Sequence, residues 1–229
     1  MKNIFKHLLD LFFPHICVVC ETSLMDSEEF VCLNCLSLLP KTNYYKQADN
    51  PVEQLLAGRI PFVRIASYMF FVKGGSLQHI IHELKYKNNP GIGVWLGKMS
   101  AKDLQGTLFL KNIDYIVPVP LHTKRLRKRG YNQSLMIAKG LSAGTGIPIR
   151  DDVVFRIVNN KSQTSKSKTE RYDNISGVFA MNNLSDFENK HILLIDDLIT
   201  TGATLEECVK TILLSSNAKI SIFTIGSTI

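Results

Sequence analysis

The sequence has few of the features that mark membrane, secreted or repetitive proteins. It holds no apolar run approaching the roughly 18 residues that a membrane span needs. The first residues include Lys6, His7 and Asp10 and run into Pro14 and a cysteine pair, so they lack the uninterrupted apolar core of a signal peptide. Internal repeats and low-complexity tracts are also missing. We therefore expect a cytoplasmic globular protein without a membrane span.

What remains is an ordinary globular composition with a basic bias. The 229 residues are 45% hydrophobic and 21% charged, which fits one main α/β core with a small appendage. The net charge of +7 favours anionic partners, such as phosphate esters or nucleic acid, without choosing between them. Five of the six residues from Lys124 to Arg129 are basic. A second basic cluster also lies in loop-like sequence: Lys161, Lys166, Lys168 and Arg171.

Strand-like and helix-like segments alternate over most of the chain. Apolar and β-branched runs predict strands at residues 59–72, 115–119, 191–195 and 220–225, and extended segments at 147–158 and 176–181. Helical spacing of apolar residues predicts helices near 77–84, 132–141 and 204–214. This alternation indicates an α/β fold with a parallel sheet flanked by helices, in which ligands bind beyond the carboxyl ends of the strands.

The N-terminal part differs from the rest of the chain. Apolar residues at helical spacing predict a short helix over residues 4–13. It lacks a cationic face, so we expect it to pack on this protein rather than on a membrane surface. The polar stretch 41–51 is typical of a linker. We predict two units, an N-terminal helix with a four-cysteine module at residues 1–50 and an α/β domain at residues 51–229.

Four of the five cysteines form two C-x-x-C pairs, Cys17 with Cys20 and Cys32 with Cys35. This spacing lets four thiolates converge on one tetrahedral centre, and soft thiolate sulfur favours Zn²⁺. A closed four-thiolate shell leaves no open position for catalysis, so we predict a structural zinc. The alternatives are two disulfides, a redox dithiol or an iron-sulfur cluster. A cytoplasmic location argues against disulfides, and two matched pairs argue against a redox dithiol.

The most informative segment runs from Ile192 to Thr204, where four apolar residues precede Asp196 and Asp197 and a glycine-containing turn opens a helix. The free N–H groups and positive dipole end of a helix start favour a phosphate. Two acids would repel that phosphate, so we expect them to bind a sugar diol beside it. The phosphate is predicted to lie at Thr200, Thr201, Gly202, Ala203 and Thr204. These features predict a ribose 5-phosphate site. The alternative interpretation of the acid pair, taken by itself, is structural: the strand ends in two acids and a threonine caps the following helix.

Basic and aromatic residues elsewhere are candidates for binding a single strand of nucleic acid. Cations bind its phosphates, and aromatic rings stack on its bases. The candidates are Lys85, Tyr86, Lys87, Lys124, Arg127, Lys128 and Tyr131. The alternative is that these cations contact only pyrophosphate or solvent.

The segment from Ile192 to Thr204 matches throughout the signature of the type I phosphoribosyltransferases. Three further segments and the cysteine module complete a set that resembles the ComF family, in particular its ComFC-like members: His82–Tyr86, Pro118–Leu121 and Arg129–Gln133. The segment Gln163–Phe179 is similar to the mobile loop and following strand of that family. The resemblance covers the chain from about Phe12 to its end.

The resemblance implies a type I phosphoribosyltransferase-like domain that binds phosphoribosyl pyrophosphate. It assigns Asp196 and Asp197 to the ribose hydroxyls and residues 200–204 to the 5-phosphate. It places the pyrophosphate at the loop that follows the strand 115–119, which includes Pro118, Val119 and Pro120. Arg125 and Arg129 are candidates to neutralise the pyrophosphate charge. In a transferase, Mg²⁺ would bridge pyrophosphate and ribose oxygens. The family further implies a role in natural transformation, where incoming single-stranded DNA is handled in the cytoplasm alongside the ComFA helicase-like ATPase.

The polar segment 159–174, rich in serine and lysine, is a candidate lid, with Lys166 and Arg171 placed to neutralise the pyrophosphate. No residue is identified as a general base, and no feature identifies an acceptor. Three functions stay open: a DNA-uptake factor that binds phosphoribosyl pyrophosphate with or without transfer, a metabolic phosphoribosyltransferase of nucleotide salvage or biosynthesis, and a regulator that senses the ligand. The cysteine module and the Arg129–Gln133 segment favour the first.

Overall fold

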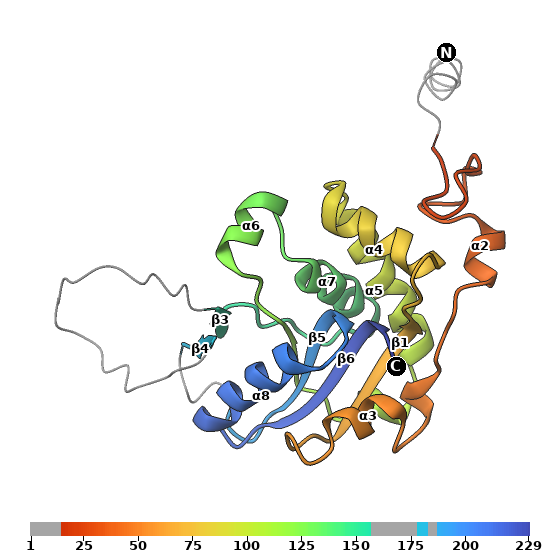
Figure 1. The fold of residues 1–229 in the computed structure, drawn as a ribbon. Helices are drawn as coiled ribbons and strands as arrows, with labels where there is room; N and C mark the ends of the chain where they lie inside the picture. Colours follow the sequence, from red (N-terminus) through yellow and green to blue (C-terminus); the bar gives the residue numbers. More distant parts are fainter. Residues whose placement is uncertain (1–14, 157–177, 183–186) are drawn as a thin grey trace.

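A parallel sheet of four strands forms the centre of the computed structural model, which describes residues 15–156, 178–182 and 187–229 (Figure 1). The strand order is β1-β6-β5-β2, and each neighbouring pair is parallel. The strands are β1 (Arg64–Phe70), β2 (Tyr115–Pro118), β5 (His191–Ile199) and β6 (Lys219–Ser227). The α/β fold class and all four predicted strands are therefore confirmed.

Burial on both faces explains why these segments form the sheet. Residues 192–195 of β5 are fully buried, and β6 is buried from Ile220 onward. The predicted strand at 191–195 is shorter than the observed one. β5 continues through the acid pair to Ile199, because β6 offers pairing partners as far as Ser227.

Helices cover both faces of the sheet. In Figure 1, α5 (Pro90–Leu104) and α7 (Gln133–Thr145) lie on one side and α8 (Ala203–Ser215) lies on the other. The helices α5 and α7 approach so closely that a Cβ atom at Gly97 would lie 2.1 Å from the Ile137 carbonyl oxygen. α5 is absent from the helices predicted from the sequence, because three glycines interrupt its apolar pattern.

The remaining elements are short or lie at the edges. The basic run predicted as loop is helical, since it forms α6 with His122 as N-cap and Gly130 in the left-handed conformation as C-cap. The other elements are α2 (Leu33–Ser37), η1 (Tyr44–Lys46), α3 (Pro51–Leu56), α4 (Ser76–Tyr86), η2 (Leu108–Leu110), α6 (Thr123–Arg129), β3 (Val154–Arg156) and β4 (Phe179–Met181). β3 and β4 pair with each other in an antiparallel sheet.

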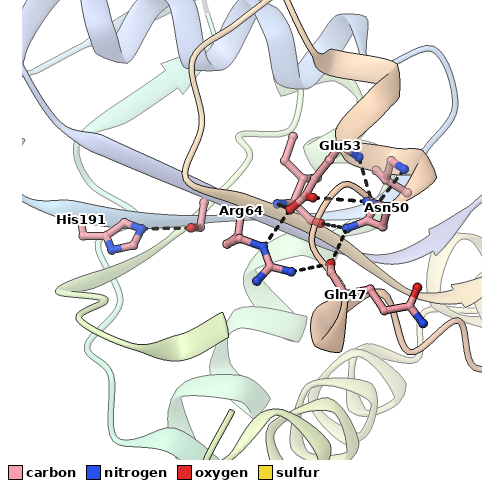
Figure 2. Close-up of polar contacts among 8 residues, drawn as sticks. Gln47, Asn50, Glu53, Arg64 and His191 are labelled. Atoms are coloured by element: carbon pink, nitrogen blue, oxygen red, sulfur yellow. Dashed lines mark hydrogen bonds and ion pairs between the residues drawn. The ribbon is translucent and has the colours of Figure 1, made fainter. Parts of the chain in front are cut away.

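The segment predicted as a linker is fixed to the edge strand β1. The Thr42 N–H donates to the Tyr68 carbonyl over 3.0 Å. Figure 2 shows a polar network that joins Asn50 and Glu53 to Arg64 of β1. The Glu53 residue is 5% exposed, and its carboxylate accepts from Arg64 Nε at 2.9 Å and from the Ile65 N–H at 3.0 Å. The chain between the cysteine module and the sheet is thus held by buried hydrogen bonds. The division at residue 50 stays a prediction.

Some predictions fall outside the described residues. These are the helix at 4–13, the lid residues Lys166 and Arg171, and the basic residues Lys161 and Lys168. Within the described ranges, no helix is both long enough and apolar enough to cross a membrane.

Candidate functional site

A cavity of about 260 Å³ lies beyond the carboxyl ends of β2 and β5. It brings together residues from six helices and strands that are far apart in the sequence. Its lining comprises Lys85, Val119, Pro120, Leu121, Arg125, Arg129, Gln133, Ser134, Arg156, Asp196, Asp197, Leu198, Thr200 and Thr204. Eight of these were assigned to the ribose, phosphate and pyrophosphate positions from the sequence. Pro118, Thr201, Gly202 and Ala203 belong to the same two loops but do not line the cavity.

The acid pair at the end of β5 has a specific hydrogen-bond environment. The Asp196 carboxylate accepts from Ser134 Oγ and from the Asp197 N–H, each at 2.9 Å. Burial raises the pKa of the Asp196 carboxyl to about 7, and the neighbouring charge of Asp197 adds to the rise. The Lys85 ammonium lies 2.8 Å from the other carboxylate, Asp197. The site therefore combines a carboxyl group that ionises near neutrality with one that forms an ion pair.

The turn that follows the acid pair is held in place by residues from outside the cavity. Gly202 has a φ of 76° at the start of α8, and a Cβ atom there would lie 2.6 Å from Leu56 Cδ2. Arg59 donates to the Thr201 carbonyl at 2.8 Å and forms an ion pair with Glu206 of α8. The sequence offers no signal for this role of Arg59, because 142 residues separate it from Thr201. Arg59 thereby fixes the start of α8, whose N-terminal end favours an anion.

Cations dominate the rest of the lining. Lys85 comes from α4, Arg125 and Arg129 from α6, and Arg156 from β3. Arg129 donates from NH1 to Gln133 Oε1 at 2.7 Å, and its guanidinium lies 5.5 Å from the centre of the Tyr86 ring. Four cationic side chains against two acids make this cavity suitable for an anion with several negative charges.

Five residues that line the cavity had no predicted ligand role: Gln133, Ser134, Arg156, Leu121 and Leu198. Gln133 lies in the Arg129–Gln133 segment that carries the family resemblance, so a signal for it was present. Arg156 had none, because its position depends on the pairing of β3 with β4.

A second, larger cleft of about 790 Å³ shares three lining residues with the cavity: Lys85, Arg125 and Arg129. Its lining is Lys85, Tyr86, Asn88, Arg125, Arg127, Lys128, Arg129 and Gly130, and we call it the basic cleft. Four of the seven residues predicted to bind a single strand line it. Lys87, Lys124 and Tyr131 do not. The Tyr131 hydroxyl instead donates to the Leu84 carbonyl at 2.5 Å, whereas Tyr86 is 63% exposed.

The structure brings the four cysteines of the N-terminal module together, with their sulfur atoms all within 4.8 Å of one another. The Cys20 and Cys32 sulfurs are 3.7 Å apart. Tetrahedral coordination with bonds of about 2.3 Å would separate sulfurs by about 3.8 Å. The backbone N–H of Cys32 donates to Cys17 Sγ at 3.4 Å, and all five cysteines are free thiols. The arrangement fits one tetrahedral metal ion and contains no disulfide. The fifth cysteine, Cys208, is fully buried in α8, as its apolar pattern predicts.

Comparison with known proteins supports the description of the α/β domain. A family model described as the phosphoribosyl transferase domain matches residues 131–227, which include the acid pair and the turn after it. The chain is 32% identical to competence protein F of Haemophilus influenzae over 138 residues, covering 58% of this chain and 60% of that protein. It is 37% identical to competence protein ComFC of Bacillus subtilis over 111 residues, covering 48% of this chain and 43% of that protein.

Other relatives align over nearly the whole chain. The DNA utilization protein YhgH of Salmonella typhimurium is 24% identical over 227 residues, covering 94% of this chain and 98% of that protein. Among solved structures, the chain is similar to the glutamine phosphoribosylpyrophosphate amidotransferase from B. subtilis, with 19% identity and a TM-score of 0.40. That overlap covers 62% of this chain and 30% of that one.

Proposed function

The chain belongs to the ComF family and carries a phosphoribosyltransferase domain, and from this premise we propose that it binds phosphoribosyl pyrophosphate in the cavity. We further propose that the basic cleft binds single-stranded DNA and that the protein handles incoming DNA in the cytoplasm during natural transformation. The names competence protein F and DNA utilization protein, borne by its relatives, support the second part.

One observation carries the ligand assignment. A single cavity is lined by the acid pair, by Thr200 and Thr204 around the start of α8, and by the α6 arginines, which are the kinds of group that a phosphorylated ribose with a pyrophosphate group requires. Asp196 and Asp197 accept hydrogen bonds from the ribose hydroxyls, and residues 200–204 bind the 5-phosphate through their N–H and hydroxyl groups. The loop of Pro118, Val119 and Pro120 binds the pyrophosphate, with Arg125 and Arg129 as its counter-charges.

Mg²⁺ fits the same site, because carboxylate oxygens at Asp196 and Asp197 are hard donors beside the predicted pyrophosphate position. When bound, it would neutralise charge on the pyrophosphate and so favour departure of that group. The chain's own residues bind and orient the ligand, while Lys85, Arg125 and Arg129 neutralise the pyrophosphate. Any rate enhancement would then come from positioning and electrostatics rather than from a covalent intermediate.

The cysteine cluster is proposed to hold a structural Zn²⁺. Four thiolates complete a tetrahedral shell, so the ion has no open position for chemistry. The module packs on the domain, since the centres of the Phe30 ring and the Trp95 ring of α5 are 6.1 Å apart in an edge-to-face contact. A metal that fixes this module would therefore also support the helix α5 beneath it. The ComFA helicase-like ATPase is proposed as a partner on the family resemblance.

Calorimetry with phosphoribosyl pyrophosphate and Mg²⁺ tests the ligand assignment. The double variant Asp196→Asn, Asp197→Asn should lose binding while keeping its circular dichroism spectrum. Asp151→Asn changes an exposed acid outside the cavity and should leave the affinity unchanged. Unchanged affinity in the double variant would refute the site. A pyrophosphate-release screen with candidate acceptors, run beside a DNA titration, separates a DNA-uptake factor from a metabolic transferase.

A further inference from the structure

The side chain of Gln133 is the most completely buried polar group that lines the cavity. The residue is 1% exposed and is the first residue of α7. Its Oε1 atom accepts a hydrogen bond from Arg129 NH1 at 2.7 Å. Its Nε2 atom is buried and has no hydrogen-bond partner within the residues that the structure describes. A buried donor without an acceptor costs free energy, so native proteins rarely keep one without a functional reason.

The contact with Arg129 fixes which way the carboxamide faces. A guanidinium can only donate, so the atom of Gln133 that meets it must be the oxygen. The NH₂ group must then lie on the other side of the carboxamide, away from Arg129. The free donor thus follows from chemistry and does not depend on which end of the amide is assigned as nitrogen.

A second donor at the same cavity is in the same situation. The Nε atom of Arg156 is buried and likewise has no partner in the described part of the chain. Arg156 lines the cavity from β3, on a different element from Gln133. Two unpartnered donors in one cavity indicate that its ligand supplies acceptor oxygens, as phosphates and sugar hydroxyls do.

We propose that Gln133 is a ligand-binding residue, whose Nε2 donates to an acceptor oxygen of the bound phosphoribosyl ligand while its Oε1 positions Arg129. This inference rests on the proposed function and goes further, because it names a recognition group that neither the acid pair nor the phosphate turn supplies. Arg156 provides the second donor. Since Arg129 also lines the basic cleft, Gln133 links the ligand in the cavity to the position of a cation that the cleft uses.

Two substitutions at position 133 separate ligand recognition from a purely structural role. Gln133→Glu keeps the shape and can still accept from Arg129, but it replaces the free donor by an acceptor that repels phosphate. Gln133→Met removes both polar atoms and retains the volume, so the free protein no longer buries an unpartnered donor. The affinity for phosphoribosyl pyrophosphate with Mg²⁺ is measured by calorimetry, and the thermal midpoint is measured without and with this ligand.

We expect both variants to lose about tenfold or more in affinity. We also expect the ligand-free thermal midpoint of Gln133→Met to equal or exceed that of the unchanged protein. If Gln133 only held Arg129 in place, Gln133→Glu would strengthen that contact and bind the ligand at least as well, and Gln133→Met would lower the ligand-free midpoint. Either result would overturn this inference and leave the proposed function standing. Failure of the unchanged protein to bind would overturn the proposed function, and this inference with it.

Discussion

The Lys85 ammonium lies 2.8 Å from the Asp197 carboxylate and joins helix α4 to the acid end of strand β5. Both side chains are mostly buried, with 18% and 13% of their surface exposed. Lys85 also lines both the cavity and the basic cleft. The positive charge of Lys85 lowers the pKa of Asp196, which burial raises. This lysine therefore favours the ionised form of Asp196 at the point where the two binding surfaces meet.

Replacement of Lys85 by methionine should weaken binding of phosphoribosyl pyrophosphate by about tenfold at neutral pH. Without the ammonium, the pKa of Asp196 rises further and its carboxyl group accepts hydrogen bonds from ribose less well. Part of the loss should be recovered at higher pH, where the acid ionises again. Calorimetry at two pH values checks this. Lys87→Met removes a lysine that lines neither surface and should bind the ligand normally. Tighter binding by Lys85→Met would mean that Lys85 competes with the ligand.

The raised pKa of Asp196 predicts how stability changes with pH. The folded protein holds this proton up to about pH 7, whereas an unfolded chain releases it near the ordinary value of 3.8. Unfolding therefore releases a proton between these values, and stability should fall as pH rises from about 4 to about 7 and then level off. Lys85, Asp197, Arg156 and Cys208 all act electrostatically with this carboxyl group, so the measured transition belongs to the cluster.

Chemical denaturation of the unchanged protein and of Asp196→Asn, at several pH values from about 5 to about 8, measures this contribution. Relative to the variant, the unchanged protein should lose on the order of 1 to 3 kcal/mol of unfolding free energy across the range. Parallel curves for the two proteins would show that Asp196 is ionised throughout. Contributions from groups far from Asp196 affect both proteins equally and cancel in the difference.

The sequence predicts the parts of this site that are local. Asp196 to Thr204 form one continuous strand, turn and helix start, so pattern and spacing reveal their arrangement. The four cysteines are equally predictable, because two short pairs need only one chain reversal to meet. In contrast, the positions of Arg59 and Arg156 near the site depend on tertiary packing, and the spacing of residues in the sequence does not predict such packing. The basic run shows a different limit, because α6 is helical with few apolar residues to mark its period.

The cysteine cluster predicts a metal dependence that can be separated from the rest of the fold. Cys32→Ser removes one of four sulfur ligands, so the purified protein should lose its zinc, measured by mass spectrometry of the metal. The thermal midpoint should fall by about 5 °C or more, equivalent to about 2 kcal/mol. Cys208→Ser makes the same chemical change at a buried cysteine outside the cluster and should keep about one zinc per chain. Full stability of the unchanged protein in a chelator would overturn the zinc assignment.

The two clefts can be tested apart, because Arg127 and Lys128 line only the basic cleft. The double variant Arg127→Gln, Lys128→Gln should bind single-stranded DNA more weakly and lower the slope of log affinity against log salt by about 1. Its affinity for phosphoribosyl pyrophosphate should stay within about twofold of the unchanged value. The measurements are a fluorescence titration at several salt concentrations and calorimetry.

Lys102→Gln with Lys139→Gln removes the same charge from exposed positions of α5 and α7 that line neither surface. Because this control lowers the net charge equally, any general effect of charge on DNA binding appears in both variants. If the slope of log affinity against log salt falls equally in the two variants, DNA binding depends only on the overall charge of the protein. A smaller slope confined to the α6 variant would place the strand in the basic cleft, beside the cavity with which it shares Arg125 and Arg129.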